Sequence, residues 1–270
     1  MMRYQKFGVA AVLLAAVLLS TGPVAAQLTQ CAVQTGPLLP DLVVDRQKLV
    51  SQIFVSEEQF NNNDCNVVEG CVTKAGKHTL LRFNTSTANI GEADLVIGSP
   101  SGCLQLFHLS ECHGHYHYEN YADYRLWTAE GYKIWQALRR TDLRADDGVN
   151  AQLLSVAVAN GELVIGHKQG FCMVDSYPYP LYEGTAGPAK FHDCTLNQGI
   201  SIGWSDEYGS HLPGQFVQIT GLPEGDYVLE NQVNPLQMLP ESDYTNNFTA
   251  VKLHYTPKHG KVPAIAEVIE

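Results

Sequence analysis

The chain has 270 residues, with 28 acidic and 17 basic side chains and a formal net charge of −11 at neutral pH. This acidity argues against a nucleic acid or an anionic membrane as a partner, because either would repel the protein. The length fits one domain with a large core or two small ones. Because no internal repeat and no Pro/Ser-rich linker divides the sequence, we expect one domain.

The first residues have the pattern of a secretory signal peptide. Arg3 and Lys6 precede an apolar run from Phe7 to Leu19, and the small residues Val24-Ala25-Ala26 follow. The run is shorter than the roughly 20 apolar residues that a membrane-spanning helix needs. The sequence therefore predicts a signal peptide over residues 1–26, cleaved near Ala26, and a secreted extracellular or periplasmic domain over 27–270 without a membrane span.

Seven cysteines follow, at positions 31, 65, 71, 103, 112, 172 and 194. In an oxidising compartment most of them should form disulfides. An odd number leaves at least one cysteine unpaired or paired between molecules. Cys31, near the expected new N-terminus, is our choice for the spare.

Strand-sized apolar runs, bounded by Gly, Asn, Pro or Asp, predict β-strands at residues 42–44, 79–83, 93–98 and 163–165. Residues 215–219 and 227–233 flank a Pro-Glu-Gly-Asp turn, so we expect a hairpin there. Helical periodicity is scarce after the apolar N-terminal run. The fold class that these signals indicate is mainly β: an antiparallel β-sandwich with long loops and few helices. Residues 40–44 and 222–247 further suggest an immunoglobulin-like module of the cell-adhesion type.

The densest chemical cluster is the run Glu111-Cys112-His113-Gly114-His115-Tyr116-His117. Alternate side chains of a strand share a face, so the three histidines could bind one ion. Imidazole suits copper, zinc, iron or nickel, and the residue types alone do not choose among them. Three surface histidines in a polar loop are the plainer alternative. The run predicts a metal site, but it leaves the reaction open.

Five segments, in order along the chain, resemble the catalytic domain of the lysyl oxidase family, in a secreted, microbial-type form. They are Cys65 to Cys71 with residues 80–83, the Cys-His-x-His-x-His motif at 112–117, Gly166 to Cys172, Gln198 to Tyr208, and residues 233–247. The resemblance therefore runs from about Asp41 to Asn247. It implies one lysyl oxidase-like catalytic domain over residues 27–270.

The resemblance implies that copper is bound by His113, His115 and His117. It also implies that Lys168 and Tyr208 form a lysine tyrosylquinone cofactor. Such a protein uses oxygen to oxidise primary amines, peptidyl lysine among them, to aldehydes, and it releases ammonia and hydrogen peroxide. The amine of Lys168 must be neutral to attack an oxidised Tyr208 ring, so we expect burial to lower its pKa.

A reaction of this kind also needs a general base. Asp123, in Tyr-Ala-Asp-Tyr, lies near the position where animal members carry a histidine, and it is our first choice. Asp206, two residues before Tyr208, is the second. Either carboxylate could instead be a structural hydrogen-bond acceptor.

The resemblance further implies disulfides between Cys65 and Cys112 and between Cys172 and Cys194. The usual partner of Cys71 is missing from residues 210–215, so we expect Cys103 to replace it. The family pattern also suggests a calcium site that ties the two ends of the domain together through hard oxygen ligands, namely Asp41, Glu241, Asp243, Asn246 and Asn247.

Two other functions fit parts of this sequence. A zinc hydrolase could use the same three histidines with an open coordination position, but it would give Lys168 and Tyr208 no role. A secreted copper-binding or adhesion module without turnover would suit the two ends of the chain. The residues identify neither the natural amine nor the oligomeric state.

Overall fold

The computed structural model describes residues 37–103, 106–139, 163–166, 168, 170–260 and 264–269. Within these residues the chain forms seventeen strands and three helices. The strands pair with one another in the antiparallel direction. The predicted mainly β, antiparallel class with few helices is therefore confirmed, whereas the immunoglobulin-like character stays a prediction. The expected signal peptide and Cys31 lie outside the described residues.

None of the helices in the described part of the chain is long and apolar enough to cross a membrane.

Five sheets make up the described structure. The largest has the order β17 (Ile265–Val268), β16 (Phe248–Thr256), β15 (Gly225–Val233), β8 (Ala122–Thr128), β9 (Leu163–Ile165). A four-stranded sheet has the order β1 (Leu42–Val44), β4 (Thr85–Asn89), β13 (Trp204–Tyr208), β11 (Tyr177–Pro178). The remaining three sheets are β14 (Phe216–Gln218), β3 (Gly76–Phe83), β2 (Ile53–Phe60); β10 (Gly170–Phe171), β7 (His115–Glu119), β6 (Phe107–Ser110); and β12 (Gln198–Ile200), β5 (Leu95–Gly98).

One apolar core is shared by all five sheets. Buried residues from each sheet belong to the same cluster, among them Leu42, Phe83, Leu95, Tyr118, Leu126, Ile200 and Leu229. Burial of apolar surface is the main favourable term in folding, so a shared core binds these sheets into one body. This agrees with the expected single domain over residues 27–270, which stays a prediction because its ends lie outside the described residues.

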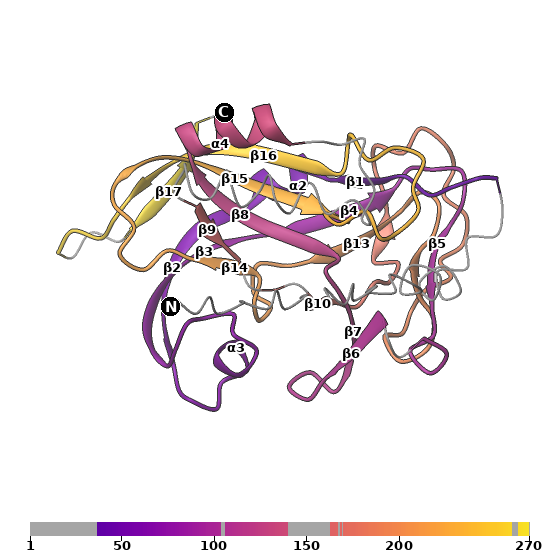
Figure 1. Cartoon of the computed structure of the whole chain (residues 1–270), viewed down its shortest axis with the longest axis horizontal. Helices are drawn as coiled ribbons and strands as arrows, with labels where there is room; N and C mark the ends of the chain where they lie inside the picture. The colour runs from indigo at the N-terminus through magenta and orange to yellow at the C-terminus, as the bar shows by residue number, and fades with distance from the viewer. Residues whose placement is uncertain are drawn as a thin grey trace, which may run out of the picture.

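The described residues form three helices. Two are short, α2 (Arg46–Ser51) and α3 (Cys65–Val68), and the third is α4 (Ala129–Leu138). Figure 1 shows α4 over the β15–β16 side of the large sheet, while α3 lies on the opposite side of the molecule, as do β6 and β7. The side chain of Thr128 begins α4 by accepting a hydrogen bond from the Gly131 N–H at 3.0 Å.

Strand β8 separates two environments. Tyr124 and Leu126 point into the shared core, whereas Trp127 packs with Trp135 of α4 on the other face. Between the sheet and α4, the fully buried Glu230 accepts hydrogen bonds from the indole nitrogens of Trp127 at 3.0 Å and Trp135 at 3.2 Å. The alternation along β8 thus assigns each of its side chains to one of the two faces.

Four predicted strand runs match β1, β3, β5 and β9, but the predicted hairpin is wrong. β14 pairs with β3, whereas β15 pairs with β8 on one side and β16 on the other. Both edges of β15 are therefore occupied. After β14, the Ile219 N–H bonds the carbonyl of Thr79 at 2.8 Å, and Gly221 with φ +83° turns the chain toward the large sheet.

Candidate active site

The histidine motif lies on the hairpin of β6 and β7. Ser110 is paired with His115 and His108 with His117, and residues 111–114 form the turn. The Gly114 N–H bonds the Ser110 carbonyl at 2.8 Å, and Gly114 has φ +69°, a conformation that favours glycine. The glycine of the motif is thus needed to close the hairpin.

Two of the three histidines alternate along β7 as expected, but the third does not lie in the strand. His115 and His117 project away from the core, because Tyr116 and Tyr118, which alternate with them along the strand, pack against it. His113 precedes the strand, in the turn. The expectation that all three histidines alternate on one strand is therefore wrong for His113.

The three imidazole rings nevertheless gather. Their centroids are separated by 4.9 Å (His115 and His117), 5.4 Å (His113 and His117) and 5.8 Å (His113 and His115). The Nε2 atoms of His115 and His117 are 3.1 Å apart. Nitrogens bound to one ion at about 2.0–2.1 Å are about 3 Å apart when they are neighbouring ligands, so this spacing fits two ligands of the same metal.

The Nε2 atom of His113 contacts a carboxylate instead. It lies 3.1 Å from Oε2 of Glu69, just after α3. In the described part of the chain, no group of three or more His, Cys, Asp or Glu side chains is placed so that it could hold a metal ion. Three imidazoles are close together, and two of them have the nitrogen spacing of shared ligands.

Burial keeps two of these histidines neutral. Burial, together with the positive charges of Lys168 and the neighbouring histidines, lowers the pKa of His117 to about 3. The pKa of His115 is also lowered, first by burial and then by His113. Metal binding requires unprotonated imidazole, so a low pKa favours ligation at neutral pH.

Lys168 is brought to the histidines by strand pairing. β10 begins two residues after Lys168 and pairs with β7, with Gly170 opposite Glu119 and Phe171 opposite Tyr118. A side chain at Gly170 would place its Cβ 3.0 Å from Cβ and 3.1 Å from Nδ1 of His117. This glycine therefore permits the close approach. His167 and Gln169, on either side of Lys168, lie outside the described residues.

Lys168 and Tyr208 meet in the interior although 40 positions separate them in the chain. The Nζ of Lys168 is 5.4 Å from the ring centroid of Tyr208 and 5.4 Å from that of Phe171. The Lys168 side chain is buried, and this burial lowers its pKa, as expected from the sequence. The pKa of Tyr208 is raised, by burial first and then by the nearby Asp206.

The hydroxyl of Tyr208 is fixed by main-chain groups. It accepts a hydrogen bond from the Cys172 N–H at 2.7 Å and donates one to the Cys172 carbonyl at 2.8 Å. The ring of Phe171 meets that of Tyr208 edge to face, with centroids 4.9 Å apart. Cys172 in turn forms the predicted disulfide with Cys194. The bridge thus lies at the residue that holds the Tyr208 hydroxyl.

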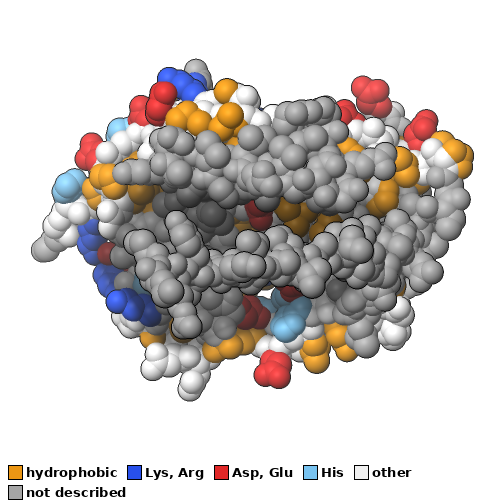
Figure 2. Space-filling view, viewed as in Figure 1, with side chains coloured by type: hydrophobic (Ala, Val, Ile, Leu, Met, Phe, Trp, Pro, Cys, Tyr) orange, Lys and Arg blue, Asp and Glu red, His pale blue; other side chains and the backbone are white. Residues whose placement is uncertain are grey.

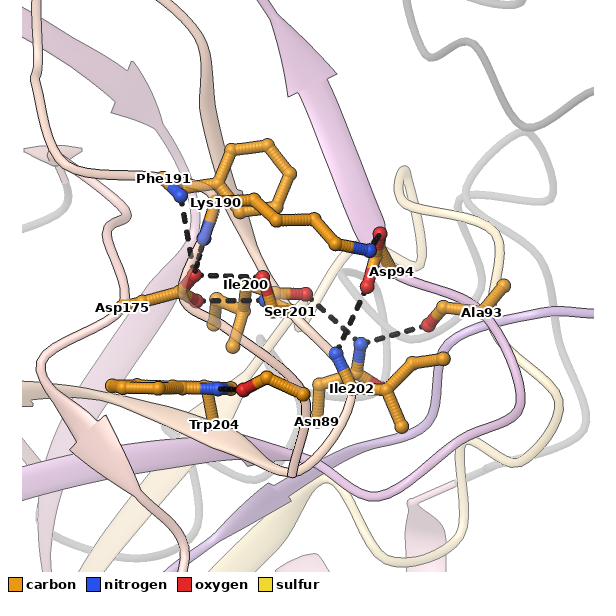
Figure 3. A network of polar contacts seen from close by, with 11 residues as sticks. Asn89, Ala93, Asp94, Asp175, Lys190, Phe191, Ile200, Ser201, Ile202 and Trp204 are labelled. Carbon is orange, nitrogen blue, oxygen red and sulfur yellow. Dashed lines mark hydrogen bonds and ion pairs between the residues drawn. The ribbon is translucent and has the colours of Figure 1, made fainter. Parts of the chain in front are cut away.

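A polar network holds the segment between Lys168 and Tyr208 (Figure 3). The carboxylate of Asp175 accepts bonds from the main-chain N–H of Lys190 at 2.7 Å and of Ser201 at 2.8 Å. Asp94 accepts from the Ile202 N–H at 3.1 Å, and its other oxygen pairs with the Lys190 ammonium at 2.5 Å. The two aspartates thus connect four parts of the chain, at residues 94, 175, 190 and 201–202, just before β13, which carries Tyr208.

Gln198 links this segment to the histidine strand. Its buried amide nitrogen donates to the carbonyls of Tyr116 at 2.8 Å and Cys194 at 2.9 Å, and its oxygen accepts from the Met173 N–H at 3.1 Å. The sequence placed Gln198 in a motif without assigning it a task. Its task became visible only in the fold, where it ties β7, the disulfide and the chain after Cys172 together.

A cavity of about 600 Å³ lies between α3 and the hairpin. Its walls combine histidine, lysine and carboxylate side chains with two exposed apolar ones, and they include Val68, Glu69, Cys71, His108, Leu109, Glu111, His117, Glu119 and Lys168. In Figure 2, histidine and acidic side chains emerge together near the place where Figure 1 shows β6 and β7. The cavity reaches both His117 and Lys168, so a small molecule in it can approach both.

The two carboxylates considered as general base lie in different environments. Asp123 pairs with Arg125 at 2.5 Å, on the face of β8 that is turned to α4, whereas Tyr124 faces Phe171. The structure therefore does not bring Asp123 to Lys168 and Tyr208. Asp206 is buried, its Oδ2 has no hydrogen-bond partner, and burial raises its pKa.

The disulfides agree with the sequence in two cases and differ in the third. Cys65 bonds Cys112, as predicted. Cys71 is a free, buried thiol, and Cys103 is in another disulfide, so the expected pairing of these two is wrong. Burial raises the pKa of Cys71 to about 11, which keeps the thiol protonated.

The residues expected to bind calcium gather at one corner. Asn246 donates to Asp41 at 2.8 Å, and Glu241 accepts from the Leu42 N–H at 2.7 Å and from the Asn247 amide at 2.8 Å. The side-chain oxygens of Asn246 and Asn247 are buried without a hydrogen-bond partner.

These unsatisfied oxygens are hard ligands of the kind that calcium takes. The remaining member of the set, Asp243, accepts bonds from Thr245 at its Oδ1.

The fold and the site together define a mainly β protein in which a cavity lined by histidines lies beside a buried lysine that contacts a partly buried tyrosine. The sequence profile of the family described as "Lysyl oxidase" matches residues 40–140 and 151–264. The chain belongs to the lysyl oxidase family, as its motifs had indicated.

Curated relatives agree with this assignment. Human protein-lysine 6-oxidase is 29% identical over 233 residues, which is 82% of this chain and 47% of that protein. Human lysyl oxidase homolog 1 is 29% identical over 236 residues, covering 84% and 35%. The pig protein-lysine 6-oxidase is 28% identical over 232 residues, covering 82% and 78%. The chain thus spans about half the length, or less, of most relatives it matches.

Proposed function

We propose that this protein is a copper-dependent amine oxidase that converts primary amines, peptidyl lysine among them, to aldehydes with oxygen. The observation that carries the proposal is the contact between the buried Lys168 and the partly buried Tyr208, with the side-chain nitrogen 5.4 Å from the ring centroid. A lysine and a tyrosine packed in this way, beside three imidazoles, are the side chains from which a lysine tyrosylquinone forms. Once formed, this cofactor would supply the electron acceptor for amine oxidation, with oxygen as the final oxidant and ammonia and hydrogen peroxide as products.

Each side chain of the pair is prepared for this role. Burial lowers the pKa of Lys168, which favours the neutral amine that can act as a nucleophile. The Cys172 main chain fixes the hydroxyl of Tyr208, so the ring keeps one orientation toward the lysine. Pre-positioning removes much of the entropic cost of joining two groups.

His113, His115 and His117 would hold the copper. The nitrogen spacing of 3.1 Å between His115 and His117 fits neighbouring ligands, and burial keeps both rings neutral. Imidazole is a common ligand of copper. The same donors would also bind zinc, so the identity of the metal rests on the family and on the neighbouring Lys168–Tyr208 pair.

The cavity suits an aliphatic amine as substrate. Val68 and Leu109 supply exposed apolar surface, while Glu111 and Glu119 supply negative charge. An alkyl chain that ends in an ammonium group matches such a wall, because its stem packs on apolar atoms and its head is attracted by carboxylates. Of the two candidate general bases, Asp206 is better placed than Asp123. Asp206 is buried, and it lies two residues before Tyr208 on the same strand.

Calcium binding and export complete the proposal. Calcium would bind Asp41, Glu241, Asp243, Asn246 and Asn247, and the partnerless oxygens of Asn246 and Asn247 support this assignment. Export is supported by the two disulfides, which form in oxidising compartments.

The decisive experiment is a search for the crosslink. Copper-loaded protein should yield a peptide in which Lys168 and Tyr208 are covalently joined, and a visible band that shifts with phenylhydrazine. Tyr208→Phe and Lys168→Ala should lack both signals. A colourless protein with full copper would contradict turnover and favour the binding module, whereas zinc-dependent hydrolysis would favour the hydrolase.

A further inference from the structure

Glu69 occupies a position that the motifs do not mark. It directly follows α3, where its N–H bonds the Cys65 carbonyl at 2.8 Å, and it lines the cavity. The disulfide between Cys65 and Cys112 attaches the start of α3 to the residue before His113. A covalent bond therefore fixes the distance between the segment that carries Glu69 and the turn that carries His113.

The carboxylate of Glu69 contacts the histidine turn at two points. Its Oε2 is 3.1 Å from Nε2 of His113, and its Oε1 accepts a hydrogen bond from the Ser110 hydroxyl at 2.6 Å. The hydroxyl oxygen of Ser110 in turn accepts the His113 N–H at 3.1 Å. Glu69 thus holds the ring of His113 directly and its main chain through Ser110.

His113 is the histidine that most needs such support. His115 and His117 are paired in β7, so the sheet fixes their backbone. His113 lies in the turn before the strand, and no ladder holds it. A turn residue keeps more freedom than a strand residue, so its ring orientation depends on side-chain contacts.

We propose that Glu69 is a positioning residue that orients His113 for metal binding. The inference rests on the proposed function, because it takes the three histidines as the copper site. A carboxylate that accepts one ring N–H of a ligating histidine fixes its tautomer and orientation, and makes the other nitrogen a better donor. Glu69 gives the turn histidine the rigidity that β7 gives the other two.

The test measures copper affinity in the full-length protein that carries Tyr208→Phe, which cannot form the quinone. Apoprotein of this variant is titrated with Cu(II) against a competing chelator, and the Cu(II) spectrum is recorded by electron paramagnetic resonance. Adding Glu69→Ala should weaken copper binding by roughly 10- to 100-fold. Glu69→Gln retains an oxygen that can accept the His113 N–H, so it should lose less affinity than Glu69→Ala.

Glu111→Gln is the matched control. It removes one negative charge from the wall of the same cavity without removing the partner of His113, so copper affinity should stay at the parental value. A similar loss in Glu111→Gln and Glu69→Ala would mean that cavity charge alone attracts copper, and it would overturn the inference. Ser110→Ala should give a smaller loss than Glu69→Ala.

Further results separate this inference from the proposed function. Parental affinity in Glu69→Ala, with an unchanged spectrum, would overturn the positioning role and leave the proposed function intact. Equal losses in Glu69→Gln and Glu69→Ala, with an oxygen donor missing from both spectra, would make Glu69 a direct ligand and also overturn it. A parental protein that binds no copper would overturn both proposals.

Discussion

The lysine–tyrosine pair and the histidine cluster lie next to each other but are built differently. Tyr208 lies in the interior, with main-chain groups on its hydroxyl, a disulfide at the residue that holds it, and an aspartate network just before its strand. The histidines lie on a hairpin, where His117 lines the cavity and His113 lies in the turn.

The difference corresponds to what each region would have to do. Two side chains that react with each other need a fixed mutual orientation, since a small misplacement is costly in rate. Metal ligands need only be near one another, because the binding energy of the ion can draw them into place. We therefore expect damage to the histidine cluster to act through metal content, and damage around Tyr208 to act on chemistry at normal metal content.

The largest effect should come from removing the histidine that connects the two regions. His117→Ala should abolish both copper binding and the phenylhydrazine-reactive band, because the ring is close to both other imidazoles and lines the same cavity as Lys168. Metal analysis and absorbance measure both quantities. His108, paired opposite His117 in the hairpin, is the control: His108→Ala should keep copper and colour, and a loss of copper there would contradict the assignment of ligands.

The second largest effect should come from Asp206, the proposed general base near Tyr208. Asp206→Asn should lower kcat by about 10²- to 10⁴-fold at normal copper content, as expected for loss of a general base. Asparagine has nearly the same shape as aspartate, so the variant should still form the quinone and show its visible band. Wild-type kcat in this variant would remove Asp206 from the mechanism.

A smaller effect is expected where the two regions touch. Gly170→Ala would place a methyl group 3.0 Å from Cβ of His117, so the histidine must move. We expect copper affinity to fall by roughly tenfold, the low end for disturbed support of a ligand. Gly187 has open space around its position for a Cβ, so Gly187→Ala should bind copper like the parent in the same titration.

The corner around Asp41 and Glu241, which we propose binds calcium, gives a prediction on how stability depends on pH. Burial raises the pKa of Glu241 to about 8. Because the ordinary pKa near 4.5 applies to the unfolded chain, metal-free folded protein should lose stability as pH rises from about 5 to 8. Calcium binds the ionised carboxylate, so it should raise Tm more at pH 8 than at pH 5. Thermal melts with calcium or a chelator measure this, and Glu241→Gln should reduce the difference in the calcium effect between pH 5 and pH 8.

The smallest effect on activity should come from Asp123, the first choice of base from the sequence. Asp123→Asn should leave kcat within about twofold of wild type, because the side chain faces α4 and contributes no proton transfer. Loss of its pairing with the buried Arg125 should lower the free energy of unfolding by about 1–2 kcal/mol. A large loss of kcat with unchanged stability would return Asp123 to the mechanism.

Local patterns predicted the strand runs well and their partners poorly. The runs at 42–44 and 163–165 match β1 and β9 within the chain that the structure describes. The hairpin of 215–219 with 227–233 failed because strand partners depend on which edges are already occupied. Apolar alternation reports that one face of a strand is buried, but it carries no information about the neighbouring strand.

The sequence predicted which residues form the candidate site better than it predicted how they are arranged. The histidines, Lys168 and Tyr208 came from motifs, and the disulfides at Cys112 and Cys172 came from resemblance. Glu69 was missed because it lies between Cys65 and Cys71 in a stretch with no chemical pattern of its own. Its proximity to His113 could have been inferred only by following the bridge from Cys65 to Cys112.

The sequence by itself determined the reactive groups of this protein, because the chemistry of an imidazole, an amine or a phenol belongs to the side chain. It also determined the β class, since periodicity two is a local property of the chain. The tertiary structure decided which groups meet: it placed Lys168 against Tyr208 across 40 residues, turned Asp123 toward α4, left Cys71 unpaired and gave His113 a carboxylate partner. Contacts of this kind depend on strand order and burial, which arise only when the whole chain packs around one core.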